Sequence, residues 1–122
     1  MRLNPDCVRD IMLLIEKNDG SEPKKFIDIM GMAEELPAYE YDEIVYHFEQ
    51  CILNNYLFGG KIGADTFVFE YMSPTGHEFL NEVRDDNIWN QVKEKFKSIA
   101  DITVPLVGEL AISVIKSKLG IS

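Results

Sequence analysis

The middle of the chain carries a helical pattern, then a hairpin pattern, and then the capped start of another helix. Apolar residues at helical spacing predict a helix from about Asp42 to Asn55. Two β-rich runs, Tyr56–Phe58 and Thr66–Met72, flank a loop that contains three glycines, which is typical of an antiparallel hairpin. Ser73 followed by Pro74 predicts the next helix, because serine caps free helical N–H groups and proline suits the first turn.

Similar caps mark the other predicted helices. Asn4 and Pro5 open a helix that ends near Asn18, Asp85 or Asp86 opens another, and Thr103 opens a last helix that runs to Leu119. The pattern is weakest over residues 20–40. There, Phe26–Met30 alternates like a short strand, and Met32–Leu36 is compatible with one helical turn. The residues between this strand and the helix that begins at Asp42 are too few for a full second helix.

Together these patterns predict a helix-dominant α+β fold. We expect a winged-helix-like core over residues 1–72, made of a helix, a short strand, a helix and a β-hairpin wing. Two or three C-terminal helices over residues 73–122 form an extension packed on that core. A chain of 122 residues, 46% of them hydrophobic, can bury one apolar core, so residues 1–122 are predicted to form a single domain.

The charge of the chain bears on its partners. In a DNA-reading winged helix, the helix before the hairpin lies in the major groove. Here that helix contains Asp42, Glu43 and Glu49 but no Lys or Arg, and the whole chain has a net charge of −9. Proteins that bind phosphates show a basic surface, so this balance disfavours nucleic acid and anionic membranes. A protein partner is favoured over DNA.

The chain lacks the signals of export or membrane insertion. No uncharged apolar run is long enough to span a bilayer, and Met1–Asp6 is a poor signal peptide. The two cysteines, Cys7 and Cys51, fall on apolar helix faces and do not suggest a disulfide framework. We therefore expect a cytoplasmic protein.

The polar arc of the 42–55 helix is the first candidate site. It presents Glu43, Tyr46, Gln50 and Asn54, with His47 at its flank and Lys61 as the one cation of the predicted wing loop. Glutamine and asparagine can read adenine, but every amphipathic helix also presents a polar face to solvent. We expect this surface to bind a protein. The alternative is a sequence-specific DNA-binding regulator that takes its phosphate contacts from Lys93, Lys95 and Lys97.

A second cluster comprises His77, Arg84, Asp85, Asp86 and Trp89. Adjacent carboxylates can bind a cation or exchange protons, but at a helix start they more often act as caps. Arg84 can pair with one of the two aspartates, and Trp89 can pack beneath them. We expect this cluster to be structural.

Catalytic and metal-binding motifs are weak. His47 and Cys51 have a spacing that suits two metal ligands, but His77 and Cys7 lie on distant segments. The sequence shows no glycine-rich phosphate loop, nucleophile elbow or recognisable triad. We therefore predict a protein that is not an enzyme and has no metal site or cofactor.

The last predicted helix has an unusually wide apolar arc, formed by Leu106, Val107, Leu110, Ala111, Val114 and Ile115. A helix this apolar is either buried or pairs with another chain. In a single small domain we expect partial exposure, and a two-fold homodimer through residues 103–119.

Two stretches resemble known proteins. Met72–Leu80 resembles the exit from the hairpin in bacterial winged-helix proteins. Glu43–Phe48, Gly76–Leu80 and Arg84–Asp86, with Trp89 and Val92–Lys93, resemble a family of small winged-helix-like proteins of unassigned function from bacteria, prophages and phages. The resemblance covers nearly the whole chain. It implies a winged-helix-like core with an added helical C-terminus and a phage-associated role, but no activity, substrate or cofactor.

Overall fold

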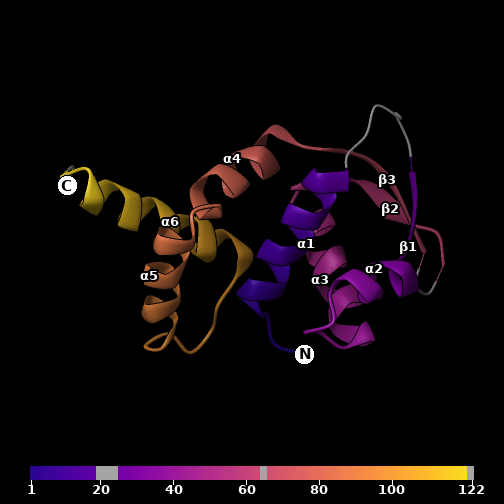
Figure 1. Cartoon of the computed structure of the whole chain (residues 1–122), viewed down its shortest axis with the longest axis horizontal. Helices are drawn as coiled ribbons and strands as arrows, with labels where there is room; N and C mark the ends of the chain where they lie inside the picture. Colours follow the sequence, from indigo (N-terminus) through magenta and orange to yellow (C-terminus); the bar gives the residue numbers. More distant parts are fainter. Residues whose placement is uncertain (19–24, 64–65, 121–122) are drawn as a thin grey trace.

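The computed structural model of the chain describes residues 1–18, 25–63 and 66–120 (Figure 1). Within these residues the elements are α1 (Pro5–Asn18), β1 (Lys25–Asp28), α2 (Ile29–Glu35), α3 (Tyr41–Leu53), β2 (Leu57–Lys61), β3 (Thr66–Met72), α4 (Pro74–Val83), α5 (Asp86–Phe96) and α6 (Val104–Lys118). The predicted helix-dominant α+β fold is confirmed, and the hairpin follows the helix predicted at residues 42–55, which is the third helix, α3.

The three strands form one antiparallel sheet in the order β1-β3-β2. An irregularity in the register lies between Phe58 and Gly59. A Cβ atom at Gly59 would lie 2.1 Å from the carbonyl oxygen of Val68, so the backbones approach too closely there for any residue but glycine. Gly59, Gly60 and Lys61 belong to β2, so the predicted wing loop was too long at this end.

The region before α3 corrects the sequence-based prediction. The strand ends at Asp28, and Ile29 and Met30, which were predicted to be in it, begin α2 instead. The reason is tertiary: Asp28 pairs with Thr66, the first residue of β3, so the ladder between the two strands, as described, ends at this pair. The segment therefore holds a seven-residue second helix, for which the sequence seemed to leave too little room.

Most predicted caps are found. The side chains of Ser73, Asp85 and Thr103 accept hydrogen bonds from the backbone N–H groups of Gly76, Ile88 and Leu106, respectively. The N-cap of α3 is Glu40, two residues before the predicted start at Asp42, and the carboxylate of Glu43 accepts a hydrogen bond from the Glu40 N–H at 3.1 Å. Asp42 lies in the first turn.

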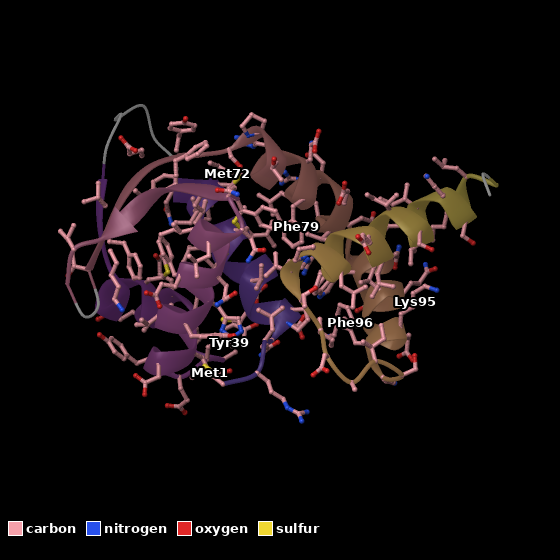
Figure 2. All side chains as sticks on the ribbon, turned by 180° about the vertical axis from the view of Figure 1, so that it is seen from behind. Met1, Tyr39, Met72, Phe79, Lys95 and Phe96 are labelled. Carbon is pink, nitrogen blue, oxygen red and sulfur yellow. The ribbon has the colours of Figure 1, made fainter. Side chains whose placement is uncertain are left out.

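The apolar core lies between α1, α3, the sheet and the start of the extension. Phe48 of α3 packs on Phe67 of β3, with ring centroids 4.6 Å apart. Phe79 of α4 stacks on Tyr56 and lies where the core meets α6 (Figure 2). Helix α6 packs on α4 and α5, and its C-terminal end projects away from the rest of the molecule (Figure 1).

Candidate functional site

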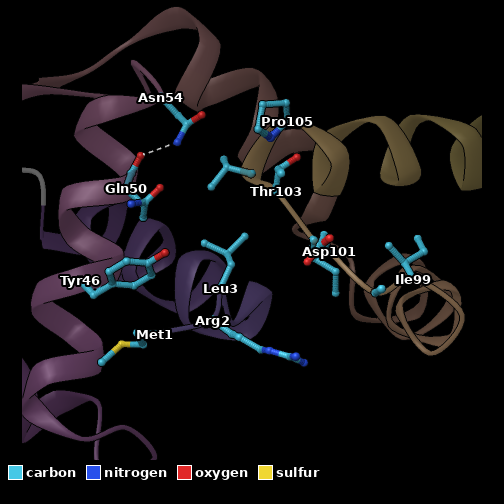
Figure 3. Close-up of a pocket in the computed structure, with 13 residues that line it drawn as sticks. Met1, Arg2, Leu3, Tyr46, Gln50, Asn54, Ile99, Asp101, Thr103 and Pro105 are labelled. Atoms are coloured by element: carbon cyan, nitrogen blue, oxygen red, sulfur yellow. Dashed lines mark hydrogen bonds between the residues drawn. The ribbon is translucent and has the colours of Figure 1, made fainter.

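Three residues of the predicted polar arc, Tyr46, Gln50 and Asn54, line a groove instead of an open surface (Figure 3). We call this feature the α3 groove; it has a volume of about 690 Å³ and is lined by Met1, Arg2, Leu3, Tyr46, Gln50, Asn54 and residues 99–105. Its walls thus combine the middle of the chain with segments from near both ends. The sequence predicted the α3 side of this site but carried no signal for the other two sides.

The α3 wall offers unsatisfied polar groups. The Nδ2 atom of Asn54 donates to the backbone oxygen of Gln50 at 2.8 Å, which leaves the Asn54 Oδ1 atom free to accept. The Gln50 amide and the Tyr46 hydroxyl have no hydrogen-bond partner among the residues that the structure describes. All three side chains are half-buried and therefore available to a ligand in the groove.

The opposite wall is the segment that joins α5 to α6. Thr103 caps α6 through its Oγ1 atom, which accepts from the Leu106 N–H at 3.3 Å. Over the described part of the chain, Ala100, Asp101 and Ile102 make no hydrogen bond, so their backbone N–H and C=O groups are open. This wall therefore presents an irregular stretch with unpaired backbone groups.

His47 does not lie at the flank of an exposed arc, as predicted; it is fully buried. Its Nε2 atom accepts a hydrogen bond of 2.7 Å from the Asn4 N–H, so the ring proton is on Nδ1, which donates to the Glu43 carbonyl at 2.7 Å. Burial lowers the pKa of His47, and the hydrogen bond to Glu43 opposes this shift. The neutral ring thus ties the start of α1 to α3, next to Leu3.

The remaining predicted surface residues are engaged within the chain. Glu43 is half-buried at the N-terminal end of α3, where it serves as a helix cap. The Nζ atom of Lys61 lies 3.4 Å from Oε1 of Glu49, so the cation of the wing pairs with α3 itself. Neither residue lines the α3 groove.

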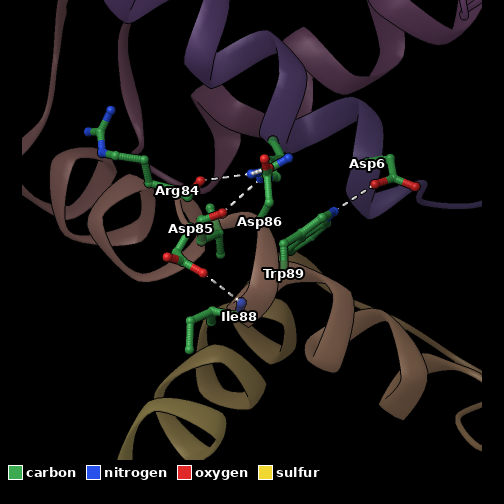
Figure 4. Close-up of polar contacts among 8 residues, drawn as sticks. Asp6, Arg84, Asp85, Asp86, Ile88 and Trp89 are labelled. Atoms are coloured by element: carbon green, nitrogen blue, oxygen red, sulfur yellow. Dashed lines mark hydrogen bonds and ion pairs between the residues drawn. The ribbon is translucent and has the colours of Figure 1, made fainter.

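The second predicted cluster joins the extension to α1 (Figure 4). Arg84 does not fork onto Asp85 or Asp86, as predicted, but binds both carboxylate oxygens of Glu16 at 2.5 and 2.7 Å. This partner is favoured because each aspartate is already engaged: Asp85 caps α5, and Asp86 pairs with Arg9 at 2.8 Å. The pairing with Arg84 lowers the pKa of Glu16.

Trp89 is buried, and its Nε1 atom donates to Oδ1 of Asp6 at 2.7 Å. The guanidinium of Arg9 lies 5.4 Å from the centre of the Trp89 ring. Arg9 also donates to the backbone oxygens of Val83 and Arg84. Sequence reasoning missed Arg9, because nothing in the local pattern of α1 indicates these contacts. His77 is exposed and makes no hydrogen bond with the other members of the cluster.

The lysines proposed for phosphate contacts lie on α5 and after it. Lys93 pairs with Asp6 at 3.2 Å, and Lys97 pairs with Glu94 at 3.1 Å. Lys95 is exposed. Two of the three cations are therefore partly neutralised by neighbouring carboxylates.

Groups that could carry out chemistry are mostly buried. Burial raises the pKa of the Cys7 thiol to about 12 and also raises the pKa of Cys51. Among the described residues, no three His, Cys, Asp or Glu side chains gather closely enough to hold a metal ion. No helix among the described residues has the length and hydrophobicity needed to cross a bilayer.

The wide apolar arc of α6 is only partly covered. Val107, Ala111 and Val114 are buried, whereas Leu106, Leu110 and Ile115 are half-buried. Two further apolar residues are exposed: Ile112 retains 39% of its accessible surface and Leu119 retains 68%. The homodimer predicted through residues 103–119 stays a prediction.

The fold is a helix-dominant α+β arrangement in which a β-hairpin follows α3 and three further helices follow the hairpin. The chain belongs to the DUF2513 family, described as "Hypothetical protein (DUF2513)", whose model matches residues 2–102. It is also 23% identical, over 98% of its own length and 99% of the relative's, to an uncharacterised protein of Haemophilus influenzae. No solved structure matches it. The family match covers α1 to α5 and both walls of the groove as far as residue 102.

Proposed function

We propose that this protein is a non-catalytic regulatory or protein-interaction module of the cytoplasm, which binds another protein through the α3 groove. The observation that carries the proposal is the α3 wall of the groove. Tyr46, Gln50 and Asn54 hold polar groups that the described part of the chain does not use. A concave site with a few convergent polar groups is the usual form of a binding site. The resemblance to phage and prophage proteins favours a phage-associated role.

Sequence-specific DNA binding is the alternative, and fewer observations support it. A recognition helix must project into a major groove roughly 12 Å wide. Here the arc of α3 is bordered by residues 1–3 and 99–105 of the same chain. Phosphate binding needs free cations, but α3 has no Lys or Arg and Lys61 is paired with Glu49.

A catalytic role is also poorly supported. The thiolate is the reactive form of cysteine, and both cysteines are buried with raised pKa values. The aspartates of the second cluster serve as a helix cap and as a partner of Arg9. Neither the two cysteines nor the two aspartates are therefore poised for nucleophilic or acid–base chemistry.

Site-specific photo-crosslinking in cells that carry the gene tests the proposal. A photoreactive amino acid replaces Gln50 in one variant and Gln91 in another, since Gln91 is exposed on α5 outside the groove. We expect a discrete protein adduct from position 50 that is absent from position 91. Equal adducts from both positions, or none from position 50 together with salt-dependent binding of duplex DNA, would contradict it.

A further inference from the structure

The two walls of the α3 groove also indicate the form of its partner, an inference that rests on the proposed function. We propose that the α3 groove binds an extended peptide segment of the partner protein, and that this segment carries Lys or Arg beside the bound stretch. The spacing of polar groups on α3, the open backbone of the opposite wall and the charge at the groove's edges each support part of this assignment.

The spacing on α3 matches an extended chain. Tyr46, Gln50 and Asn54 follow one another at intervals of four residues, and four residues of helix rise about 6 Å. An extended peptide advances about 6.6 Å for every two residues, which is the interval at which its backbone groups repeat on one side. The three side chains can therefore meet successive N–H or C=O groups of one extended segment.

The chemistry of these side chains also suits a peptide backbone. An amide side chain carries both a donor and an acceptor, as does each peptide unit. Gln50 has both groups unpaired within the described residues, and Asn54 has a free acceptor. The other wall adds the unpaired backbone groups of residues 100–102. A bound helix would use its own backbone N–H and C=O groups internally, so its backbone could not pair with these walls.

The charge of the site favours a basic segment. Asp101 lies on the wall opposite α3, and Asp42 lies one helical turn before Tyr46 on the same side of α3. Arg2 is the one cationic side chain among the lining residues of the groove as described, and Asp101 is the one carboxylate among them. Residues 31–60 contain no Lys or Arg and hold six carboxylates: Glu34, Glu35, Glu40, Asp42, Glu43 and Glu49. Cationic side chains beside the bound stretch would be attracted to Asp42 and Asp101, whereas nucleic-acid phosphates would be repelled by them.

Selection from peptide pools tests the inference. The full chain is presented with three pools of random peptides of about 12 residues, which span roughly 40 Å when extended. One pool is basic, one neutral and one acidic, and the selected peptides are synthesised and their affinities measured by fluorescence anisotropy. Binding of a labelled random-sequence DNA duplex to the chain is measured in a separate titration.

We expect the basic pool to yield binders whose affinity falls with added salt. Gln50→Ala should weaken a selected peptide about threefold to tenfold, the loss expected for one or two hydrogen bonds, while Gln91→Ala leaves it unchanged. The double change Asp42→Lys and Asp101→Lys should weaken binding, whereas Glu78→Lys, at an exposed site on α4, should not. Circular dichroism of each variant checks that the fold is kept.

The possible outcomes distinguish a failure of this inference from a failure of the proposed function. Neutral or acidic binders that are lost in Gln50→Ala would overturn the basic character of the segment and leave the groove as the binding site. If no pool yields binders but the crosslink from position 50 persists, the extended peptide is wrong while the proposed function stands. Peptides that bind Gln50→Ala as tightly as the wild type, or a duplex that binds the wild type more tightly than Gln50→Ala, would overturn the inference at this groove.

Discussion

The indole Nε1 of Trp89 donates a hydrogen bond of 2.7 Å to Oδ1 of Asp6, across 83 positions of the sequence. It joins α5 of the extension to the first turn of α1. Arg9, one turn further along α1, reinforces the same junction through the Trp89 ring and through Asp86. Because residues 99–105 follow α5 directly, this junction also helps to fix the far wall of the α3 groove.

Replacing Trp89 by phenylalanine keeps most of the apolar contact but removes the indole N–H. The partly buried Asp6 then loses one partner, so we expect the free energy of unfolding to fall by about 1–2 kcal/mol. Urea unfolding measures this change. Lys95→Ala, an exposed change on the same helix, is the control and should stay within roughly 0.5 kcal/mol of wild type. Equal stabilities of the two variants would show that the hydrogen bond contributes little.

The two arginines of the junction should differ in their effect on stability. Arg9 has 11% of its side chain exposed and donates to two backbone carbonyls as well as to Asp86, so Arg9→Ala leaves acceptors unpaired. We expect a loss of roughly 2–4 kcal/mol. Arg84 is 46% exposed in its pair with Glu16, so Arg84→Ala should cost about 1 kcal/mol or less. Chemical denaturation would contradict this account if Arg84→Ala were the more damaging change.

Two glycines in helices should respond in opposite ways to alanine. A Cβ atom at Gly76 would lie 2.2 Å from the carbonyl oxygen of Tyr56, so Gly76→Ala must move the backbone at the base of the hairpin. We expect it to cost at least about 2 kcal/mol. At Gly108 the nearest atom is 3.6 Å away, so Gly108→Ala should be neutral or stabilise by up to about 1 kcal/mol through helix propensity. Thermal unfolding of both variants provides the comparison.

Local chemistry made part of this structure predictable. Ser73, Asp85 and Thr103 each cap the helix that follows, because a cap requires only a polar side chain three residues before the N–H that it binds. The strand Thr66–Met72 was also predicted with its observed bounds, since its β-branched and aromatic residues lie between turn residues.

Contacts between distant segments were not predictable in the same way. The partner of Arg84 is 68 positions away, and that of His47 is 43 positions away, so neither pairing leaves a local pattern. The side of α3 predicted to be an open polar arc is half-enclosed for the same reason. Residues 1–3 approach α3 because α1 packs on α3, and residues 99–105 follow α5, which contacts α1 through Trp89 and Asp6; amphipathic periodicity cannot report either approach.

His47 should make stability depend on pH. Burial lowers its pKa in the folded protein below the ordinary value of 6.5, so the unfolded chain takes up the proton first as the pH falls. The contribution of His47 to the free energy of unfolding is therefore fully present above pH 6.5. It is lost as the pH falls from there towards the lowered pKa of the folded state. Urea midpoints at about pH 7.5 and about pH 5.5 measure this loss.

Two histidine variants isolate that contribution. His47→Gln should shrink the loss of stability between the two pH values, because no titrating ring remains at the buried site. His77→Gln, which replaces the other of the two histidines at an exposed position, should retain the wild-type loss. If the wild type and both variants lost the same stability between the two pH values, His47 would not be the cause of the pH dependence.

The partly exposed helix α6 predicts a two-fold homodimer. Ile112 and Leu119 present apolar surface that another copy of the helix could cover. Sedimentation equilibrium should show a concentration-dependent dimer for the wild type, and Ile112→Lys should shift it towards monomer. Ser113→Lys, at the next exposed position of the same helix, is the charge-matched control. A wild-type monomer at high protein concentration would contradict the prediction.

The side-chain amide resonances of Gln50 and Asn54 report directly on the central claim, that the α3 groove binds a protein segment. They can be followed by NMR while the isotope-labelled chain is titrated, first with random-sequence duplex DNA at low salt and then with a peptide selected from the pools. We expect the peptide to shift both amides and leave that of Gln91 unchanged, and the duplex to shift neither. Shifts of Gln50 and Asn54 by the duplex, reversed steeply by salt, would contradict the account and identify α3 as a DNA-reading helix.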